Sequence, residues 1–473
     1  MTTLQQQRML LEIEYNHEKE EFRKQTETMG VERKIRRGDA WFPVTIGNCY
    51  YNSLNQAVVE VTRTKDSDIE HNFEPGRPVC FFTVRRDEKT RRERIQYMSF
   101  TATVSYADHD RIVVALPNSG RIADLQRSEA IGLQLFFDET SYRLMFDALD
   151  RVISAKTGRL AALRDIFYTK APAQKLTFEP MRLPWLNASQ EQAVNEVLRA
   201  KDVAVVHGPP GTGKTSCALK KMVETFHCEA QTQILLLSYT NRAVDEICKA
   251  ISSIRPEVDF IRVGSELSCD EAYRHHLIEN ELSLCTRRSE VAERIARCRI
   301  FVGTVASISG KPELFRLKRF DVAIIDEATQ ILEPQLLGIL CARSENGENA
   351  VGKFILIGDH KQLPAVVLQN TEQSEIYDEG LRSAGLKNLK DSLFERLYRT
   401  LQTSSEDLFP DSASVSAPNH RSFDMLCKQG RMHPEVAHFA NQAFYEGRLL
   451  PVGLPHQMED NQDVQRMVFL PSE

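Results

Sequence analysis

The sequence predicts an α/β protein whose main part is a doubly wound parallel sheet, preceded by a smaller β-barrel module that helices flank. Three observations support this prediction. A glycine-rich loop stands between an apolar run at 203–206 and a stretch of helix-forming residues that follows it. Further apolar runs recur at intervals and are separated by segments with helical spacing, as a parallel sheet requires. Upstream, short Val-, Ile- and Phe-rich runs alternate with turn residues, which is typical of a small barrel.

The glycine-rich loop has the residue pattern of a P-loop, and it reads Gly208-Pro209-Pro210-Gly211-Thr212-Gly213-Lys214-Thr215. Its glycines let successive N–H groups point at phosphate oxygens, and the helix that follows adds the partial positive charge of its N-terminus. Lys214 can reach the β- and γ-phosphates, and the Thr215 hydroxyl can bind Mg²⁺. A chance glycine-rich turn is the alternative, but every position matches in a strand–loop–helix context. We infer a nucleotide-binding protein.

Length and composition restrict the class of protein. With 473 residues, the chain is too long for one core, and we expect two to four domains. Hydrophobic residues make up 42% and charged residues 27%, which is ordinary for a soluble globular protein. The net charge is −6, so any binding of nucleic acid must use local basic patches.

Cysteine usage and hydropathy predict a soluble, reduced, cytoplasmic protein. The ten cysteines are scattered and include no Cys-x-x-Cys pair, which argues against zinc fingers and against a secreted disulfide framework. The polar N-terminus has no hydrophobic signal core, and no apolar run is long enough to span a bilayer. We therefore expect neither zinc nor a membrane as a partner, and the oligomeric state stays open.

The first 180 residues are predicted to be a β module between helices. Residues 1–35 have helical spacing, 36–137 form the β-barrel, and 138–180 return to helix and then a linker. The predicted strands lie at 57–61, 79–84, 95–104, 111–116 and 131–137.

A run of basic residues falls between two of these strands, and it includes Arg85, Arg86, Arg91 and Arg92. A solvated hairpin tip is the ordinary interpretation of such a run. The functional alternative is a loop that contacts the phosphates of a nucleic acid.

Residues 181–410 are predicted to form the ATPase domain, with strands at 203–206, 234–237, 299–302, 322–325 and 354–357. Candidate chemical residues follow the ends of these strands, where parallel sheets place their chemistry. Asp326 is suited to hold Mg²⁺ through water and phosphate oxygens, and Glu327 to activate the attacking water. Gln362 can touch the γ-phosphate from the loop after the next strand.

A polar segment precedes the first helix of this domain. In it, Asn187 is a helix N-cap candidate, and Gln190 can hydrogen-bond adenine N6 and N7 and so select ATP. The alternative is an N-cap followed by a surface glutamine.

Taken together, the motifs resemble those of superfamily 1B helicases of the nonsense-mediated-decay and senataxin type. Eight segments match in order: Leu186–Gln190, the P-loop, Ser238–Asp245, Arg262–Gly264, Val302–Ser307, Asp326–Pro334, Gly358–Pro364 and Gln429–Pro434. An AAA+ ATPase can share the P-loop but not the rest of this series.

The resemblance implies a RecA-like fold for the ATPase domain and ATP-driven translocation on single-stranded DNA or RNA, typically 5′ to 3′. It also implies that the barrel is an accessory domain on a two-helix stalk, and that residues 266–298 are a short second insertion. Thr240, Asn241 and Thr304 are implied to touch the nucleic acid backbone. Arg431 is implied to contact the γ-phosphate from a second RecA-like domain.

Two departures from the family pattern bear on activity. Gly430 stands where relatives have the tyrosine that is expected to stack on adenine. Residues 411–473 match only a linker and the beginning of a second RecA-like domain, without the family's later motifs. We therefore expect a fragment or truncated reading frame that is inactive alone. The alternative is an ATP-binding, nucleic-acid-binding adaptor without productive hydrolysis.

Overall fold

The computed structural model describes residues 3–51, 57–86, 93–128, 130–169, 171, 173–283, 285–377, 379–383, 387–406 and 425–458. The chain divides into two compact units, Met1–Leu11 with Leu144–Glu473, and Glu12–Arg143. The tip of the predicted basic hairpin, most of the predicted linker after residue 406 and the last fifteen residues lie outside the described ranges. The domain boundaries predicted at 35, 137, 180 and 410 stay predictions.

Helices α1 (Thr3–Thr28) and α4 (Glu139–Ser154) extend across the division between the units. In the first unit, Arg8 Nε of α1 lies 2.8 Å from Asp150 Oδ1 of α4. In the second, Lys19 Nζ lies 2.6 Å from Glu139 Oε1, and the Tyr15 ring packs at 5.8 Å from that of Phe137. The Tyr15 ring also packs at 5.2 Å from that of Tyr142, so the predicted stripe of α1 contacts α4.

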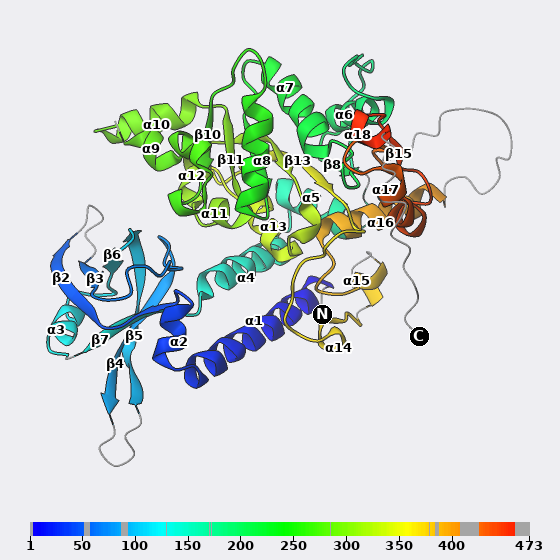
Figure 1. Cartoon of the computed structure of the whole chain (residues 1–473). Coiled ribbons are helices and arrows are strands. Elements are labelled where there is room, and N and C mark those ends of the chain that lie inside the picture. The colour runs from blue at the N-terminus through cyan, green and yellow to red at the C-terminus, as the bar shows by residue number, and fades with distance from the viewer. Residues whose placement is uncertain are drawn as a thin grey trace. The chain divides into compact units, whose positions relative to one another are not determined.

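The second unit contains a seven-stranded antiparallel sheet in the order β1-β7-β4-β5-β6-β3-β2 (Figure 1). Its strands are β1 (Ala40–Trp41), β2 (Val44–Tyr51), β3 (Ala57–Arg63), β4 (Pro78–Arg86), β5 (Glu93–Ala107), β6 (Arg111–Ala115) and β7 (Ile131–Leu135). Alternate residues such as Val59, Phe81 and Ile112 point into one apolar core. The five predicted strands are present. The sheet also contains β1 and β2, which were not predicted. Because β1 and β2 are the outer strands of the described sheet, closure into a barrel stays a prediction.

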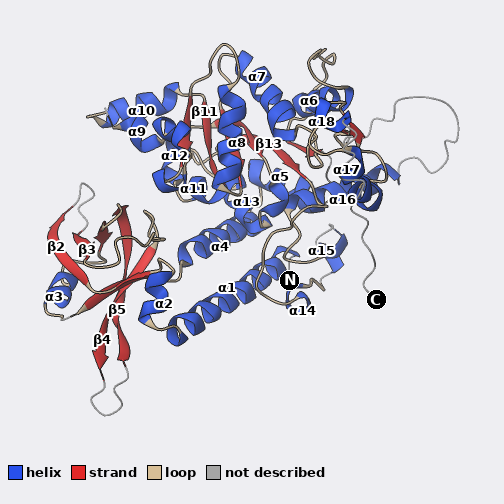
Figure 2. Ribbon diagram, viewed as in Figure 1, coloured by secondary structure: helices blue, strands red, loops and turns tan. Residues whose placement is uncertain are grey.

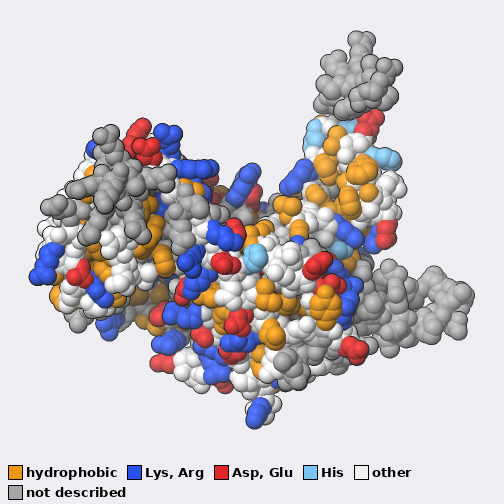
Figure 3. Space-filling model, turned by 90° about the horizontal axis from the view of Figure 1, so that it is seen from below, with side chains coloured by type: hydrophobic (Ala, Val, Ile, Leu, Met, Phe, Trp, Pro, Cys, Tyr) orange, Lys and Arg blue, Asp and Glu red, His pale blue; other side chains and the backbone are white. Residues whose placement is uncertain are grey.

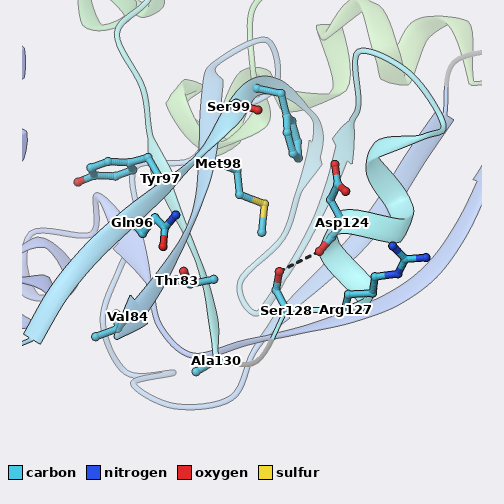
Figure 4. A pocket seen from close by; sticks show the side chains of 11 residues that line it. Thr83, Val84, Gln96, Tyr97, Met98, Ser99, Asp124, Arg127, Ser128 and Ala130 are labelled. Atoms are coloured by element: carbon cyan, nitrogen blue, oxygen red, sulfur yellow. Dashed lines mark hydrogen bonds between the residues drawn. The ribbon is translucent and has the colours of Figure 1, made fainter. Parts of the chain in front are cut away.

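Two short helices, α2 (Val31–Arg36) and α3 (Arg121–Gln126), complete this β module. A pocket of about 740 Å³ lies between β4, β5 and the segment that follows α3. Figure 4 shows Met98 and Gln96 of β5 on one side and Asp124 and Arg127 on the other. None of the residues predicted to bind ATP lines this pocket. The pocket is therefore separate from the predicted nucleotide site.

The first unit is built on a six-stranded sheet, all parallel, in the order β10-β11-β9-β12-β13-β8. The strands are β8 (Val203–His207), β9 (Ile234–Ser238), β10 (Phe260–Val263), β11 (Ile300–Thr304), β12 (Phe320–Ile325) and β13 (Val351–Gly358). The predicted α/β fold with a parallel sheet is confirmed. Strand β10, which the sequence pattern missed, occupies one edge.

Helices cover both faces of this sheet (Figure 2). Ile324 and Ile355 face the apolar cluster that contains Val194, Met222 and Ile247 of three helices on one side. Their chain neighbours, such as Phe354, instead line a small cavity with residues of three other helices. Between α4 and residue 406, the helices of this unit are α5 (Gly158–Tyr168), α6 (Ala188–Arg199), α7 (Lys220–Cys228), α8 (Asn241–Ser252), α9 (Ile278–Leu282), α10 (Arg288–Arg297), α11 (Val305–Ser309), α12 (Pro312–Leu317), α13 (Glu333–Leu340), α14 (Thr371–Ser374), α15 (Glu379–Ser383) and α16 (Leu393–Glu406).

Residues 425–458 form a small parallel β–α–β unit. It consists of β14 (Lys428–Gln429), α17 (Pro434–Phe444) and β15 (Leu450–Pro451), followed by α18 (Pro455–Met458). Several large apolar side chains on it are exposed: Val436, Phe439, Phe444, Leu450, Val452 and Met458. Figure 3 shows one face of the molecule, on which apolar side chains gather beside histidines while basic and acidic side chains intermingle elsewhere.

Two further expectations concern disulfide bonds and membrane-spanning helices. All ten cysteines are free. No described helix combines the length and the apolar character needed to cross a membrane.

A fully buried polar cluster joins α5, α13 and α16. Arg396 Nη2 of α16 lies 2.7 Å from Glu333 Oε1 of α13, and neither side chain is exposed. Tyr168 donates its hydroxyl to Glu333, and Arg396 also donates to the carbonyl oxygen of Phe167. Burying two charges is costly, but removing one partner costs more because the other charge is left without compensation.

Replacing Arg396 with Ala is therefore expected to lower the free energy of unfolding by about 3–5 kcal/mol. Arg399→Ala, one turn later on α16, is the matched control because the Arg399 side chain is 35% exposed and pairs with Glu395. We expect that variant to lose at most about 1 kcal/mol. Urea unfolding followed by circular dichroism measures both, and equal losses would contradict this account of the buried pair.

Candidate active site

The loop after β8 adopts a backbone path that its glycines make accessible. Gly211 and Gly213 have φ of +75° and +73°, in the left-handed region that residues with a Cβ avoid. At Gly208, an added Cβ would lie 2.8 Å from Lys214 Cβ. Within the loop, the Thr212 hydroxyl donates to the carbonyl oxygen of Pro209 at 2.7 Å, across Pro210. The loop is thus tightly folded.

Lys214 and Thr215 begin the helix that follows this loop. Its first turn is π-helical, over Lys214–Leu219, and it continues as α7. The free N–H groups of a helix start face the loop, so the backbone alone favours an anion there.

Two acidic residues at the end of β12 meet the loop. Lys214 Nζ lies 2.6 Å from Glu327 Oε1, and the Thr215 hydroxyl donates to Asp326 Oδ2 at 2.5 Å. The strand order explains the meeting, because only β13 separates β12 from β8 and all three strands end at the same edge. The structure therefore brings four of the predicted site residues together.

The environment of the acidic pair suits a bound cation. Asp326 is 2% exposed, and burial raises the pKa of its carboxyl group, although Lys214 lowers it. Glu327 has φ of +52°, a left-handed conformation that is unusual for a residue with a side chain. Its Oε2 is buried and lacks a hydrogen-bond partner within the described part of the chain. A hydroxyl and a buried carboxylate are the kind of oxygen donors that Mg²⁺ uses, so these residues fit the predicted metal.

Asn187 and Gln190 support the loop from α6. They form a reciprocal capping box, and Gln190 Nε2 also donates to the carbonyl oxygen of Thr212 at 2.9 Å. Gln190 is buried, and both ends of its amide are engaged by the protein. Its role in holding the loop is visible here, whereas its predicted contact with adenine stays a prediction.

Gln362 lies in the loop after β13, where its amide donates to Asp359 Oδ2 at 2.8 Å. Among the described residues, His207, Asp359 and His360 form a group that could hold a metal ion. The Asp359 carboxylate, however, already receives hydrogen bonds from several neighbours, including the backbone N–H of Lys361. We interpret the group as a hydrogen-bond network, because a metal ion would have to displace these donors.

Arg431 reaches the nucleotide loop from the β14–α17–β15 unit. The N–H of Gly430 donates to the carbonyl oxygen of Gly211 at 2.9 Å, and a Cβ on Gly211 would lie 2.5 Å from Arg431 Cβ. The exposed Arg431 side chain therefore starts directly beside the loop. At Gly430, a Cβ would lie 3.1 Å from Leu454 Cδ1, so a tyrosine there would require Leu454 to move.

The residues predicted to contact nucleic acid follow two neighbouring strands. Ser238 at the end of β9 pairs with Thr304 at the end of β11, so the segments that follow share one edge. Thr240 caps α8, which starts at Asn241, while Thr304 caps α11 and is 6% exposed. Thr240 is exposed, whereas the Thr304 hydroxyl is engaged within the protein. The contacts of all three with a strand stay predictions.

Two exposed aromatic residues, one of them beside Thr240, were not singled out from the sequence. Tyr239 is exposed and directly precedes Thr240, and Trp185 is 92% exposed just before the Asn187 cap. Exposed aromatic rings next to a binding edge can stack on bases. Their exposure is a property of the folded chain, and only their residue type was available as a signal in the sequence.

Comparison with known proteins gives consistent matches. A model of the AAA_11 family, an AAA domain, matches residues 185–284 and 279–370. Human DNA replication ATP-dependent helicase/nuclease DNA2 is 30% identical over 273 residues, covering 56% of this chain and 21% of its own. The Arabidopsis thaliana helicase/nuclease JHS1 is 35% identical over 190 residues, covering 40% and 13%. Rat DNA-binding protein SMUBP-2 is 24% identical over 398 residues, covering 74% and 36%.

The fold and the site define an ATPase domain of the P-loop class. The matched segment and the relatives indicate a superfamily 1 helicase of the nonsense-mediated-decay, senataxin and DNA2 type. The chain spans about a fifth of the length of the DNA2 relatives it matches.

Lys214→Ala is expected to weaken ATP binding by about 10- to 100-fold, because it removes a charged hydrogen-bond donor to phosphate. Lys221→Ala on α7, whose ammonium pairs with Glu224, is the matched control and should bind normally. Fluorescent ATP titration measures both, with circular dichroism to establish folding. Unchanged binding in the Lys214 variant would remove this lysine from the site.

Proposed function

We propose that this chain is the ATPase part of a superfamily 1B helicase that couples ATP hydrolysis to movement along single-stranded DNA or RNA. The observation that supports this most strongly is the meeting of Lys214 with Glu327 and of Thr215 with Asp326. It puts a phosphate-binding cation beside a carboxylate that can accept a proton, as hydrolysis of a γ-phosphate requires. Several of the relatives are ATP-dependent helicases by name, which favours the same function.

In this proposal, Glu327 takes the proton of the attacking water. Its unpartnered Oε2 leaves one oxygen available for that hydrogen bond. Lys214 and Arg431 supply positive charge to the γ-phosphate as its negative charge shifts in the transition state. Gln362 lies in the adjacent loop and orients the phosphate or the water. ATP itself would be held by the backbone N–H groups between Gly208 and Thr215.

Mg²⁺ would be held by the Thr215 hydroxyl and, through water, by Asp326. Such an ion would supply positive charge that offsets the negative charge of the phosphates. The hydrogen bond from Thr215 to Asp326 supports the assignment, because it brings the two oxygen ligands together beside the loop.

Nucleic acid would bind at the carboxyl edge near Thr240, Asn241 and Thr304, through backbone phosphates. The buried Arg262 of β10 supports this edge from within by pairing with Asp245 of α8. We further propose that the β module is a barrel-type accessory domain and that the β14–α17–β15 unit begins a second RecA-like domain. The parallel strands and exposed apolar side chains of that unit favour further strands packing against it.

ATP hydrolysis by the chain, measured with and without single-stranded DNA and RNA, tests the proposal. A helicase ATPase is expected to turn over faster with a strand present, and Glu327→Gln should lower that turnover by about 10²- to 10⁴-fold while still trapping ATP. ATP binding without turnover would favour the adaptor alternative. A fully active Glu327→Gln variant would place the general base elsewhere.

The basic run that begins at the end of β4 and continues toward β5 yields a separate prediction. Replacing Arg85, Arg86, Arg91 and Arg92 with Ala should weaken single-strand binding and flatten its salt dependence. The slope of log affinity against log salt is expected to fall by about 0.7 for each phosphate that the variant no longer neutralises. Fluorescence anisotropy at several salt concentrations measures it, and an unchanged slope would identify the run as a solvated hairpin.

A further inference from the structure

The carboxylate of Asp359 collects hydrogen bonds from three separate parts of the first unit. Its Oδ1 lies 2.9 Å from His207 Nε2 and accepts the Lys361 N–H at 3.0 Å. Its Oδ2 accepts the Gln362 amide at 2.8 Å and the Tyr445 hydroxyl at 2.7 Å. The side chain is completely buried. All the acceptor positions of this carboxylate are therefore used by the protein.

Each of the three side-chain donors belongs to an element that borders the nucleotide loop. His207 ends β8 and directly precedes Gly208, and Gln362 belongs to the loop after β13. Tyr445 immediately follows α17, in the unit that also contributes Arg431. The Asp359 carboxylate thus connects β8, the loop after β13 and the β14–α17–β15 unit.

The network keeps Asp359 charged at neutral pH. Burial alone would raise the pKa of this carboxyl group, but the donors His207, Gln362 and Tyr445 outweigh burial and lower it to about 2. The pKa of the Tyr445 hydroxyl is raised, by burial first and then by its bond to Asp359. Tyr445 is therefore a protonated donor to a charged acceptor, which is among the stronger hydrogen bonds in proteins.

The ring of Tyr445 has a different role from its hydroxyl. It packs with Met425 and Leu449 in a small apolar cluster, and Leu426 N–H donates to the His207 carbonyl oxygen at 2.9 Å. These contacts attach the unit to β8 without the hydroxyl. Tyr445→Phe therefore removes the bond to Asp359 while keeping the ring that the cluster needs.

We propose that Tyr445 is a positioning residue that acts through Asp359 on Gln362 and on the strand leading into the P-loop. The bond links the orientation of the loop after β13 to the position of the β14–α17–β15 unit against β8. This inference rests on the proposed ATPase function only in the role it gives to Gln362. The bond itself links the three segments whether or not nucleotide is present.

Hydrogen–deuterium exchange of the whole chain without nucleotide tests the link directly. In Tyr445→Phe, amides in 203–213 and 359–365 are expected to exchange about tenfold faster, together with those near residue 445. Tyr377→Phe is the matched control, because it removes the hydroxyl of a tyrosine that is 66% exposed. Faster exchange confined to 425–458 would mean that the hydroxyl serves only local packing and would overturn the proposal.

A second variant removes a different hydrogen-bond donor to the Asp359 carboxylate. Gln362→Ala truncates a half-buried loop residue, so the fold should survive, and it should speed exchange around Tyr445 if the two donors are coupled. No change around Tyr445 would argue against coupling even if Tyr445→Phe failed to fold.

Repeating the exchange with ATPγS and Mg²⁺ separates the two proposals. Protection of residues 441–450, around Tyr445 and away from Arg431, by nucleotide in the unaltered chain is expected to be abolished in Tyr445→Phe. Nucleotide protection of 441–450 that persists in the variant would overturn the positioning role. If nucleotide binds nowhere, the ATPase proposal fails, while the nucleotide-free comparison still decides whether Tyr445 positions the loop.

Discussion

The active site depends on one constraint, which is that β12, β13 and β8 lie side by side with their carboxyl ends at one edge of a parallel sheet. This arrangement brings Asp326 and Glu327 to the first helical turn after the P-loop, and the loop with Gln362 follows the strand that lies between β12 and β8. Neither the ion pair nor the hydrogen bond at that edge could form if the strands were ordered differently. Helices pack on both faces of the sheet. The buried Glu333–Arg396 pair joins two of these helices, α13 and α16.

Backbone geometry sets the second constraint. Gly211 is pressed against Arg431, and Gly430 donates a hydrogen bond to Gly211, so two glycines allow two distant segments to approach closely. At Gly430 itself, a Cβ would lie 3.1 Å from Leu454 Cδ1, so a larger residue there requires a small shift of that leucine. The loop, its arginine and the Asp359 network thus form one connected set of contacts around the space proposed for the γ-phosphate.

Much of the fold could be predicted because apolar runs of β-branched residues mark buried parallel strands. The missed strands have a physical explanation. Strand β10 is four residues long and contains Arg262, a buried charge that pairs with Asp245 and breaks the apolar pattern. Strand β2 is mostly exposed and lacks a clear alternation, and β1 has only two residues. Local pattern is weakest where a strand is short, exposed or stabilised by a distant partner.

The sequence by itself determined the residue pattern of the P-loop, because the pattern lies within eight consecutive positions. It also singled out Asp326, Glu327 and Gln362 as candidate site residues, because polar side chains stand out after apolar strands. Only the tertiary structure decided that the Gln190 amide braces Thr212, and that Tyr445 meets Asp359 from 86 residues away. Such contacts depend on which elements become neighbours when the chain folds. The periodicity within a single helix or strand does not predict those neighbours.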